Sequence, residues 1–435
     1  KNTIKAMAMN VLLLGSGGRE HALAWKLAQS KLLDQLYIAP GNPGTASCGT
    51  NINLNPSDFE AIRDFVWTNN IQMVVVGPEE PLVKGIWDYF KNDPVLNRVP
   101  VIGPSQAGAN LEGSKAFSKA FMSKYQIPTA TYAEFHAHQI AEAQNYIRSM
   151  NPPFVLKADG LAAGKGVIIT SDVNEACECV ANMLSGSAFG KAGECLVIES
   201  FLKGIELSMF IATDGDNYVI LPEAKDYKRI GEGDTGLNTG GMGAVSPVSF
   251  ADQAFIEKVK NRIIHPVLSG LKSESIEYQG FLFIGLMNCN GDPYVIEFNC
   301  RMGDPETEVV MPRIQSDLLE LFSAMSLKQL HSFKLEVTPE HALTVMMVSG
   351  GYPETYETDK IIELPTQGTN SLLFHAGTCN SNRGLVTKGG RVMALTAFGT
   401  SLEEARKNAY QKLSQIHFEN MYYRRDIGLD LMTIE

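Results

Sequence analysis

A repeated pattern of short apolar segments, each closed by a turn rich in glycine and proline, constrains the fold of this chain most strongly. Such segments occupy residues 11–14, 36–39, 73–76 and 101–102, and helical patterns lie between them. A strand that is apolar on both faces has to be covered on both faces, which is typical of a parallel sheet between helices. Ligands bind such sheets beyond the carboxyl ends of the strands. We therefore predict an α/β fold with a binding site near these turns.

The sequence divides into three regions of different texture. Residues 9–111 carry the alternation of strands and helices and predict a parallel α/β domain. Residues 112–334 contain two stretches dense in glycine and predict a second domain. Residues 335–435 are typical of a separate, smaller α/β unit. The eight residues before Met9 are either a vector remnant or a native extension, and the fold prediction leaves them aside.

Composition and charge exclude several classes of protein. The chain has 435 residues, of which 44% are hydrophobic and 20% charged, as in an ordinary globular protein. No apolar run reaches the ~18 residues of a membrane-spanning helix, so we expect a soluble protein with no membrane partner. The formal net charge of −11 repels phosphate backbones, so we expect no nucleic-acid partner.

Cysteine usage indicates the compartment. The seven cysteines are odd in number and form neither a CxxC zinc pattern nor a disulfide ladder, which favours a reducing, cytoplasmic location. Cys177 and Cys179 lie in a helical pattern, where residues two apart diverge by about 200°. We therefore interpret both as packing residues.

The first turn, the string GSGG from Gly15, begins like a dinucleotide fingerprint but does not complete it. Glu20 stands at the third glycine position, and no acidic residue ends the second strand, which argues against a nicotinamide dinucleotide. Backbone N–H groups at a helix start bind phosphate well, and Arg19 adds a cation. We favour phosphate binding here, with a plain tight turn as the alternative.

Lys157 ends a strand and is followed by a glycine-rich loop at residues 160–166. Glycines let backbone amides approach phosphate oxygens, and a lysine supplies a point charge, so the pair is a candidate phosphate clamp. The loop lacks the Walker order of residues, and a mobile hairpin explains it equally well. Residues 199–206 can hold a nucleotide base and ribose, although this stretch alone fits an ordinary charged loop better.

Glu297 and Asn299 form a stronger signal. Residues two apart on a strand point to the same face, and both side chains offer the oxygen ligands that magnesium prefers. Arg301 points the same way and can neutralise a phosphate. The apolar residues that precede Glu297 place this group at a strand end, so a polar surface strand fits less well. Elsewhere, the chain shows no nucleophile elbow and no HExxH spacing, so neither serine nor zinc-peptidase chemistry is favoured.

The candidate phosphate, nucleotide and metal residues follow one another in an order that resembles the ATP-grasp superfamily of carboxylate–amine ligases. Within this superfamily, the sequence resembles the phosphoribosylamine–glycine ligase family. The strings that carry the resemblance reach from Met9 nearly to the end of the chain. They are GSGGREHALAWKLAQS from Gly15, APGNPGTA from Ala39, VGPEEPLVKG from Val76, LEGSKAFSK from Leu111, LKADGLAAGKGV from Leu156, DTGLNTGGMGAVSP from Asp234, VIEFNCRMGDPETE from Val295 and RRDIG from Arg424. Long strings at many positions make the match far more specific than a shared fold.

The resemblance implies an ATP-grasp fold with an N-terminal parallel-sheet, Rossmann-like domain at 9–111, an ATP-grasp domain at 112–334 and a small C-terminal α/β domain at 335–435. A mobile lid would span about residues 129–199. The implied reaction joins glycine to 5-phosphoribosylamine with ATP, through glycyl phosphate, in purine biosynthesis. The alternative is another ATP-grasp ligase or carboxylase of purine metabolism. A non-catalytic nucleotide sensor fits poorly, because the phosphate and metal residues are all present.

The resemblance also implies individual roles. ATP would contact Lys115, Lys157, Gly164, Gly166, Glu199, Phe201, Leu202, Glu206 and Met287. Magnesium or manganese would be bound by Glu297 and Asn299. Phosphoribosylamine would be held by Gly17, Gly18, Arg19, Gly41, Asn42, Gly77, Pro78 and Glu79. Glycine and the acyl phosphate would lie near Arg301, Asp226, Asn238, Gly240 and Gly241, with Arg301, Lys157, Asp226 and Asn238 as the catalytic set.

One departure from the superfamily pattern concerns the metal. Many members carry a further metal carboxylate on the strand before the one with Glu297, but residues 283–287 offer none. We therefore expect weak metal binding until ATP supplies phosphate oxygens. We expect small-molecule partners only, and a monomer is favoured.

Overall fold

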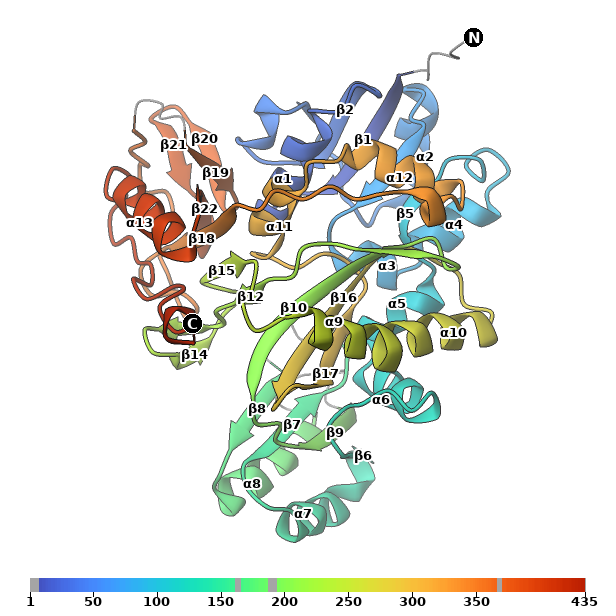
Figure 1. The fold of residues 1–435 in the computed structure, drawn as a ribbon, viewed down its shortest axis with the longest axis vertical. Helices are drawn as coiled ribbons and strands as arrows, with labels where there is room; N and C mark the ends of the chain where they lie inside the picture. The colour runs from blue at the N-terminus through green and yellow to red at the C-terminus, as the bar shows by residue number, and fades with distance from the viewer. Residues whose placement is uncertain (1–7, 161–165, 187–193, 366–369, 435) are drawn as a thin grey trace.

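The parallel sheet predicted from the apolar segments is present. The computed structural model describes residues 8–160, 166–186, 194–365 and 370–434 (Figure 1). Its N-terminal strands are parallel and run in the order β3-β2-β1-β4-β5. Their bounds are β1 Met9–Gly15, β2 Leu33–Pro40, β3 Thr50–Asn51, β4 Met73–Val76 and β5 Val101–Pro104.

Helices cover both faces of this sheet, as the continuous apolar strands predict. Val11 and Leu13 of β1 pack with Leu23 of α1 (Gly18–Leu27), whereas Leu12 and Leu14 pack with the helix α2 (Phe59–Thr68) on the other face. The helical pattern expected between the segments 36–39 and 73–76 is thus confirmed as α2, and Asp58 caps it by accepting the N–H of Ala61.

The same sheet continues into the middle of the chain. β16 (Tyr278–Cys289) pairs antiparallel with β5 through Tyr278 and Gln279, and β10 (Ile205–Thr213), β11 (Tyr218–Ile220) and β17 (Asp292–Asn299) extend it to nine strands. Residues on both sides of position 112 therefore share one sheet.

A small lobe at the bottom of Figure 1 has its own sheet and core. Its antiparallel order is β6-β9-β7-β8, from Tyr132–His136, Cys195–Ser200, Phe154–Ala158 and Val167–Thr170. Two helices, α7 (Ile140–Ser149) and α8 (Val173–Leu184), cover one face of this sheet, and the buried residues form a separate cluster. Cys177 is buried in this cluster and Cys179 packs against it, which confirms both as packing residues.

The C-terminal sheet is antiparallel, in the order β12-β15-β18-β22-β19, and α13 (Leu402–Leu413) packs on it. Its strands are Lys225–Asp226, Gly243–Ser246, His341–Val348, Arg391–Gly399 and Ser371–His375. The first two of these strands precede residue 335, so the C-terminal unit is not a separate sheet. β12 and β15 have only two and four residues, which is too few for an alternating pattern to be recognised in the sequence.

The described structure also contains two hairpins and further α-helices. Two hairpins pair β13 (Arg229–Gly231) with β14 (Thr235–Asn238) and β20 (Thr378–Ser381) with β21 (Gly384–Thr387). The other helices are α3 Glu79–Val83, α4 Ile86–Asn92, α5 Gln106–Gly113, α6 Lys115–Lys124, α9 Gln253–Val259, α10 His265–Ser273, α11 Thr307–Arg313 and α12 Leu318–Ser326. Within the described ranges, no helix has both the length and the apolar character needed to cross a membrane.

Candidate active site

Three neighbouring strands bring the predicted base, ribose and metal residues onto one sheet. Glu206 on β10 lies directly opposite Met287 on β16. Glu297 on β17 faces Gly285 of β16, and Asn299 faces Phe283 two positions farther along. A side chain at position 285 would crowd Glu297, because a Cβ at Gly285 would lie 3.2 Å from Glu297 Cγ. Gly285 therefore leaves space for Glu297 at the point of β16 where a further metal carboxylate could otherwise stand.

Lys157 is buried at the end of β7, between the small lobe and β17. Its Nζ lies 3.0 Å from Glu199 Oε2 and donates to the carbonyl oxygen of Ile296 at 3.3 Å. Glu199 is buried within β9 rather than in the loop after it, and its other oxygen lies 3.2 Å from Lys119 Nζ. Burial lowers the pKa of Lys119 to about 8, against the opposing field of Glu199. Lys119 is a residue that the sequence interpretation missed.

Lys115 lies at the start of α6, facing the turn that follows β7. Its backbone N–H donates to Asp159 Oδ1 at 2.5 Å, and its Nζ donates to the carbonyl oxygen of Gly160 at 2.9 Å. Burial lowers the pKa of Lys115, while Glu297 and Asp159 act in the opposite direction. Lys115, Lys157 and Glu297 are therefore close enough for their charges to interact. Gly166 accepts the N–H of Ala158 beside this turn, and Gly164 lies outside the described residues.

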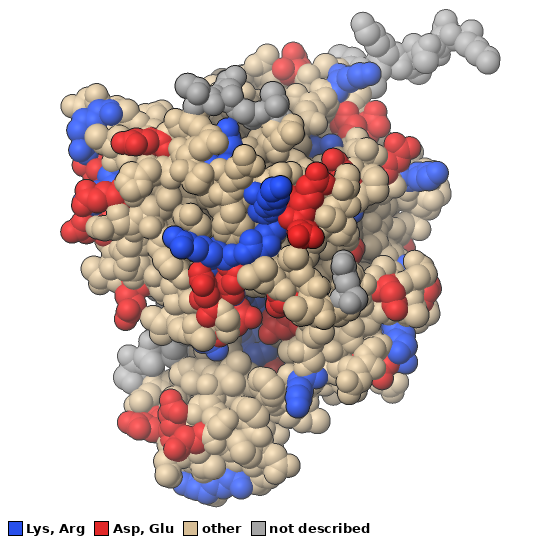
Figure 2. All heavy atoms as spheres, turned by 60° about the vertical axis from the view of Figure 1, so that its left-hand side comes forward, with Lys and Arg blue, Asp and Glu red and all other residues tan. Residues whose placement is uncertain are grey.

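Glu297 stays ionised in spite of its burial. Burial alone would raise its pKa, but Lys228, Lys157, Arg301 and Lys115 together hold the pKa below its usual value. An ionised carboxylate can bind a divalent ion, and the four cations that interact with it can neutralise a phosphate. In Figure 2, basic and acidic side chains gather in the middle of the face, above a hollow next to the small lobe.

A second charged cluster surrounds Asp226 at the end of β12. Burial raises the pKa of Asp226, and Glu206 adds to this effect against Lys228. Lys228 Nζ lies 3.4 Å from Glu206, and the fields of Glu206 and Asp226 hold the pKa of Lys228 well above its usual value. Burial and the nearby Asp226 raise the pKa of Glu306 to about 8. Asp226 is thus close to Glu206 and Glu297, the residues predicted for ribose and metal, and Lys228 and Glu306 belong to the same cluster.

Arg301 bridges two carboxylates on the side of Asn299. Its Nη2 lies 2.5 Å from Glu112 Oε1, and its Nε lies 3.3 Å from Glu79 Oε2. Placing the amide nitrogen of Asn299 toward Glu112 allows a 3.2 Å hydrogen bond, which leaves the amide oxygen available as a ligand. Burial opposes ionisation of Glu79, but Arg301 and Arg19 lower its pKa.

The helix start at α1 differs from the predicted phosphate nest. The N–H of Gly17 donates to Glu20 Oε2 at 2.7 Å, and the N–H of Arg19 reaches Asp304 Oδ2 at 3.4 Å. The Arg19 side chain is buried, and its Nε lies 2.7 Å from Glu20 Oε1. A Cβ at Gly18 would lie 2.4 Å from a carboxylate oxygen of Glu308. The protein's own carboxylates fill this turn, as in the tight-turn alternative.

The end of β4, the strand next to β1, also leaves space for the Glu20 carboxylate. A Cβ at Gly77 would lie 2.2 Å from Glu20 Oε1. Pro78 caps α3, and Glu79 is the first residue of that helix. Gly77 thus provides space for Glu20, while Glu79 faces Arg301.

Gly41 and Asn42 lie beside the turn before α1 and line a cavity of about 310 Å³ between the N-terminal sheet and the β20–β21 hairpin. Lys388 also lines the cavity. The Asn42 amide donates to the carbonyl oxygens of Ser16 and His375, and its oxygen accepts the N–H of Gly44. Asn42 therefore shapes the cavity with a side chain that is already hydrogen-bonded.

The glycine-rich stretch after β14 lies next to Arg391. The N–H of Gly240 donates to the Tyr352 hydroxyl at 2.9 Å, and its carbonyl oxygen accepts from Arg391 at the same distance. Gly241 has φ +122°, which favours glycine. Asn238 ends β14 opposite Arg229.

Phe201 and Leu202 lie in the segment between β9 and β10, where the Phe201 side chain is exposed.

Sequence reasoning missed several charged residues of this region. They are Glu112, Lys119, Lys228, Asp304, Glu306, Glu308, Lys388 and Arg391. Glu112, Lys119, Asp304, Glu306 and Glu308 lie inside strings that carried the resemblance, which was a usable signal. Lys228 lies two residues from the predicted Asp226, but charge at one position does not show which way a side chain points.

The chain matches three family descriptions in sequence order. They are "Phosphoribosylglycinamide synthetase, N domain" over residues 9–112, its "ATP-grasp (A) domain" over 113–307, and its "C domain" over 342–430. The chain belongs to the phosphoribosylglycinamide synthetase family. The expected family, its ATP-grasp fold and its ligase class are thereby confirmed.

Members of this family match nearly the whole chain. A phosphoribosylamine–glycine ligase of Vibrio cholerae is 45% identical over 425 residues, covering 97% of this chain and 98% of that protein. One from Rhizobium meliloti is 46% identical over 421 residues, with the same coverage. The crystal structure of a Thermotoga maritima phosphoribosylamine–glycine ligase is 37% identical, with a TM-score of 0.83 over 96% of this chain and all of that one.

A more distant structure shares the fold. The biotin carboxylase domain of a Hydrogenobacter thermophilus 2-oxoglutarate carboxylase has a TM-score of 0.71 at 17% identity, over 96% of this chain and 92% of that one. At this identity the likeness concerns the architecture only.

Proposed function

We propose that this protein ligates glycine to 5-phosphoribosylamine with ATP, giving glycinamide ribonucleotide, ADP and phosphate in purine biosynthesis. The observation that carries the proposal is the Glu297 carboxylate, which is partly buried at a strand end and interacts with the charges of four cations, Lys228, Lys157, Arg301 and Lys115. Family membership supports the choice of substrates. A cluster of this kind neutralises the charge of phosphates during transfer.

The reaction needs no nucleophile from the protein. The glycine carboxylate attacks the γ-phosphorus of ATP and releases ADP, and the sugar amine then attacks glycyl phosphate and releases phosphate. We assign the ATP phosphates to Lys115 and Lys157, and the ribose to Glu206 opposite Met287. These residues have to position the reactants and exclude water.

Magnesium or manganese fits the donors on β17. Glu297 is ionised, and the Asn299 amide can present its oxygen when its nitrogen faces Glu112. Hard oxygen ligands of this kind suit either ion. The bound ion would neutralise charge on the phosphate oxygens. Arg301, Asp226 and Asn238 remain our candidates around glycine and the acyl phosphate.

The sugar phosphate is assigned to the region between the N-terminal sheet and the C-terminal unit. The cavity lined by Gly41, Asn42 and Lys388 offers a cation and a volume of about 310 Å³. The cluster around Gly17 and Arg19 lies on the same side of the sheet, at the carboxyl ends of its strands.

The small lobe is our candidate for the lid. Its hydrophobic cluster is separate from the others, and Lys157 and Asp159 connect it to β17 and α6. A lobe with its own core can move as a unit over ATP.

We also propose a cytoplasmic location, supported by seven free thiols, and a monomer remains a prediction.

An ADP-release assay with each acceptor omitted in turn tests this function. Release that requires both glycine and phosphoribosylamine supports it. Release with another purine intermediate, or with bicarbonate in place of glycine, would indicate a different ATP-grasp ligase or a carboxylase.

A further inference from the structure

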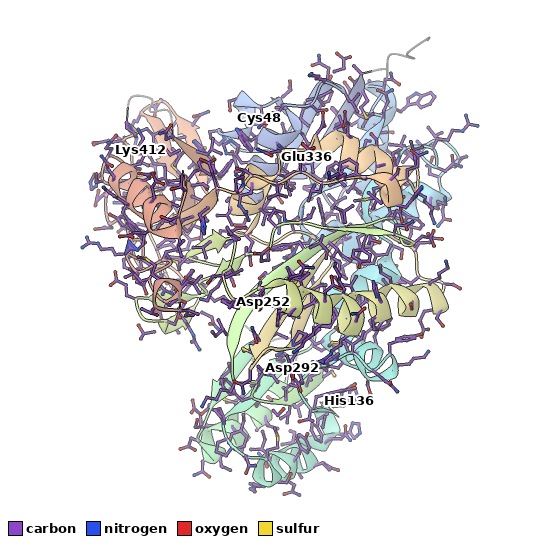
Figure 3. All side chains as sticks on the ribbon, in the orientation of Figure 1. Cys48, His136, Asp252, Asp292, Glu336 and Lys412 are labelled. Atoms are coloured by element: carbon purple, nitrogen blue, oxygen red, sulfur yellow. The ribbon has the colours of Figure 1, made fainter. Side chains whose placement is uncertain are left out.

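We propose that Glu134, His136 and Cys195 form a binding site for a zinc-class divalent transition metal ion on the small lobe. The site is separate from the catalytic cluster. It spans β6, which is an edge strand of the lobe's sheet, and its neighbour β9. Figure 3 labels His136 on this lobe, below the rest of the molecule.

The sheet geometry brings three ligand atoms together. Glu134 and His136 are two residues apart on β6, so they point to the same face. Cys195 on β9 is the direct cross-strand partner of His136. One ligand atom from each residue lies within 4.8 Å of the other two. The Glu134 Oε1 atom is 3.1 Å from His136 Nε2 and 3.5 Å from Cys195 Sγ.

The ligand set selects the type of metal. A thiolate, an imidazole and a carboxylate suit Zn²⁺ and chemically similar ions, whereas Mg²⁺ and Ca²⁺ prefer oxygen ligands. Three protein ligands leave a fourth tetrahedral position for water. The ring of His138 is nearly parallel to that of His136, with centroids 6.3 Å apart, and it forms a second imidazole beside the site.

The charge next to the thiol favours a cation, because Glu134 Oε1 accepts from Cys195 Sγ at 3.5 Å. A bound metal ion would pair with this carboxylate and with the thiolate at the same time. The His136 and Glu134 side chains are 51% and 35% exposed, so an ion can reach them from solvent.

Backbone contacts connect this site to the ATP region. The N–H of Asp159 donates to the carbonyl oxygen of Cys195 at 3.0 Å, and Asp159 Oδ1 accepts the N–H of Lys115. Joining β6 to β9 through a metal would therefore stiffen β9, the strand that contacts the turn after β7. We expect Zn²⁺ to raise the melting temperature of the full chain.

Cobalt titration tests the proposal. The full-length protein is stripped of metal and titrated with Co²⁺, whose thiolate complexes absorb in the near ultraviolet and whose tetrahedral complexes absorb strongly in the visible. We expect both bands in the wild type and in Cys179→Ser, a matched thiol control on α8 of the same lobe. We expect Cys195→Ser to lose the thiolate band and His136→Ala to weaken binding at least tenfold.

Zn²⁺ protection of Cys195 from alkylation, read by peptide mass spectrometry, gives a second measurement on an unaltered chain. Protection that disappears in Glu134→Gln supports the site. Equal Co²⁺ spectra in the wild type and Cys195→Ser, or unchanged alkylation of Cys195 at saturating Zn²⁺, would overturn it. Neither readout depends on ligase activity, so this inference can fail without affecting the proposed function.

Discussion

Lys157 Nζ lies 3.0 Å from Glu199 Oε2, so the cation assigned to the ATP phosphates is paired with the carboxylate assigned to the adenine edge. The same Nζ donates to the carbonyl oxygen of Ile296, the residue before Glu297. One buried lysine thus connects β7, β9 and β17. Its contacts link the residues that we assign to the base, the phosphates and the metal.

Replacing Lys157 by Met should raise the KM for ATP and lower kcat. A charge-assisted contact contributes about 1.5–3 kcal/mol, so we expect an effect of about 10- to 100-fold on kcat/KM. Steady-state kinetics at varied ATP measure it. Lys119→Met is the control, because Lys119 contacts the other oxygen of Glu199; it should lower stability more than ATP affinity. Equal kinetic losses in both variants would mean that Lys157 acts only through Glu199.

Glu297→Gln keeps the size of the side chain but removes its charge. We expect an intact fold, a severely reduced kcat and a higher metal requirement, because the variant loses the anion that faces four cations. Asn299→Asp adds an anion and should be milder, with a shift toward manganese. Thermal unfolding and metal-titrated kcat on the same preparation distinguish the roles.

An alternative role for Glu297 is to pair with Arg301. Arg301 instead pairs with Glu79 and Glu112, so a purely structural role is not expected. Normal kcat at saturating magnesium with unchanged metal dependence would remove Glu297 from the site.

Arg19→Ala should destabilise the fold. Removing one partner of a buried ion pair costs about 3–5 kcal/mol, because Glu20 would be left buried and unpaired. Urea unfolding measures the loss. Arg63→Ala is the matched control: Arg63 pairs with Asp93 at 2.7 Å near the surface, so the expected cost is at most about 1 kcal/mol. A small loss for Arg19→Ala combined with a raised KM for phosphoribosylamine would instead identify Arg19 as a phosphate ligand.

A histidine pair should make the contact between α1 and β19 sensitive to acid. The N–H of His375 donates to His21 Nδ1 at 2.8 Å. Burial lowers the pKa of His21 to about 3, with help from His375, and that of His375 to about 4. The unfolded chain binds more protons than the native one between about pH 4 and 6.5, so stability should fall as the pH drops through this window. Urea midpoints across it should change less steeply in His21→Gln; equal slopes would exclude the pair.

The sequence predicted features that short segments determine. Residues 73–76 form a buried strand because each side chain is apolar, and Glu297 and Asn299 share a face because they are two apart on β17. Contacts between residues that are far apart in the sequence could not be predicted from such local patterns. The glycines around α1 suggest a phosphate site, yet their space is taken by Glu20 and Glu308. Similarly, nothing local shows that Glu112 reaches Arg301, 189 positions away.

The most direct test of the proposed reaction follows one oxygen atom. With glycine whose carboxylate carries oxygen-18, attack on ATP places one labelled oxygen between the glycyl carbon and phosphorus, and attack by the amine leaves that oxygen on phosphate. We predict one labelled oxygen in each phosphate released alongside glycinamide ribonucleotide, measured by mass spectrometry. Unlabelled phosphate accompanying that product would contradict a glycyl phosphate intermediate, and with it the account of the site.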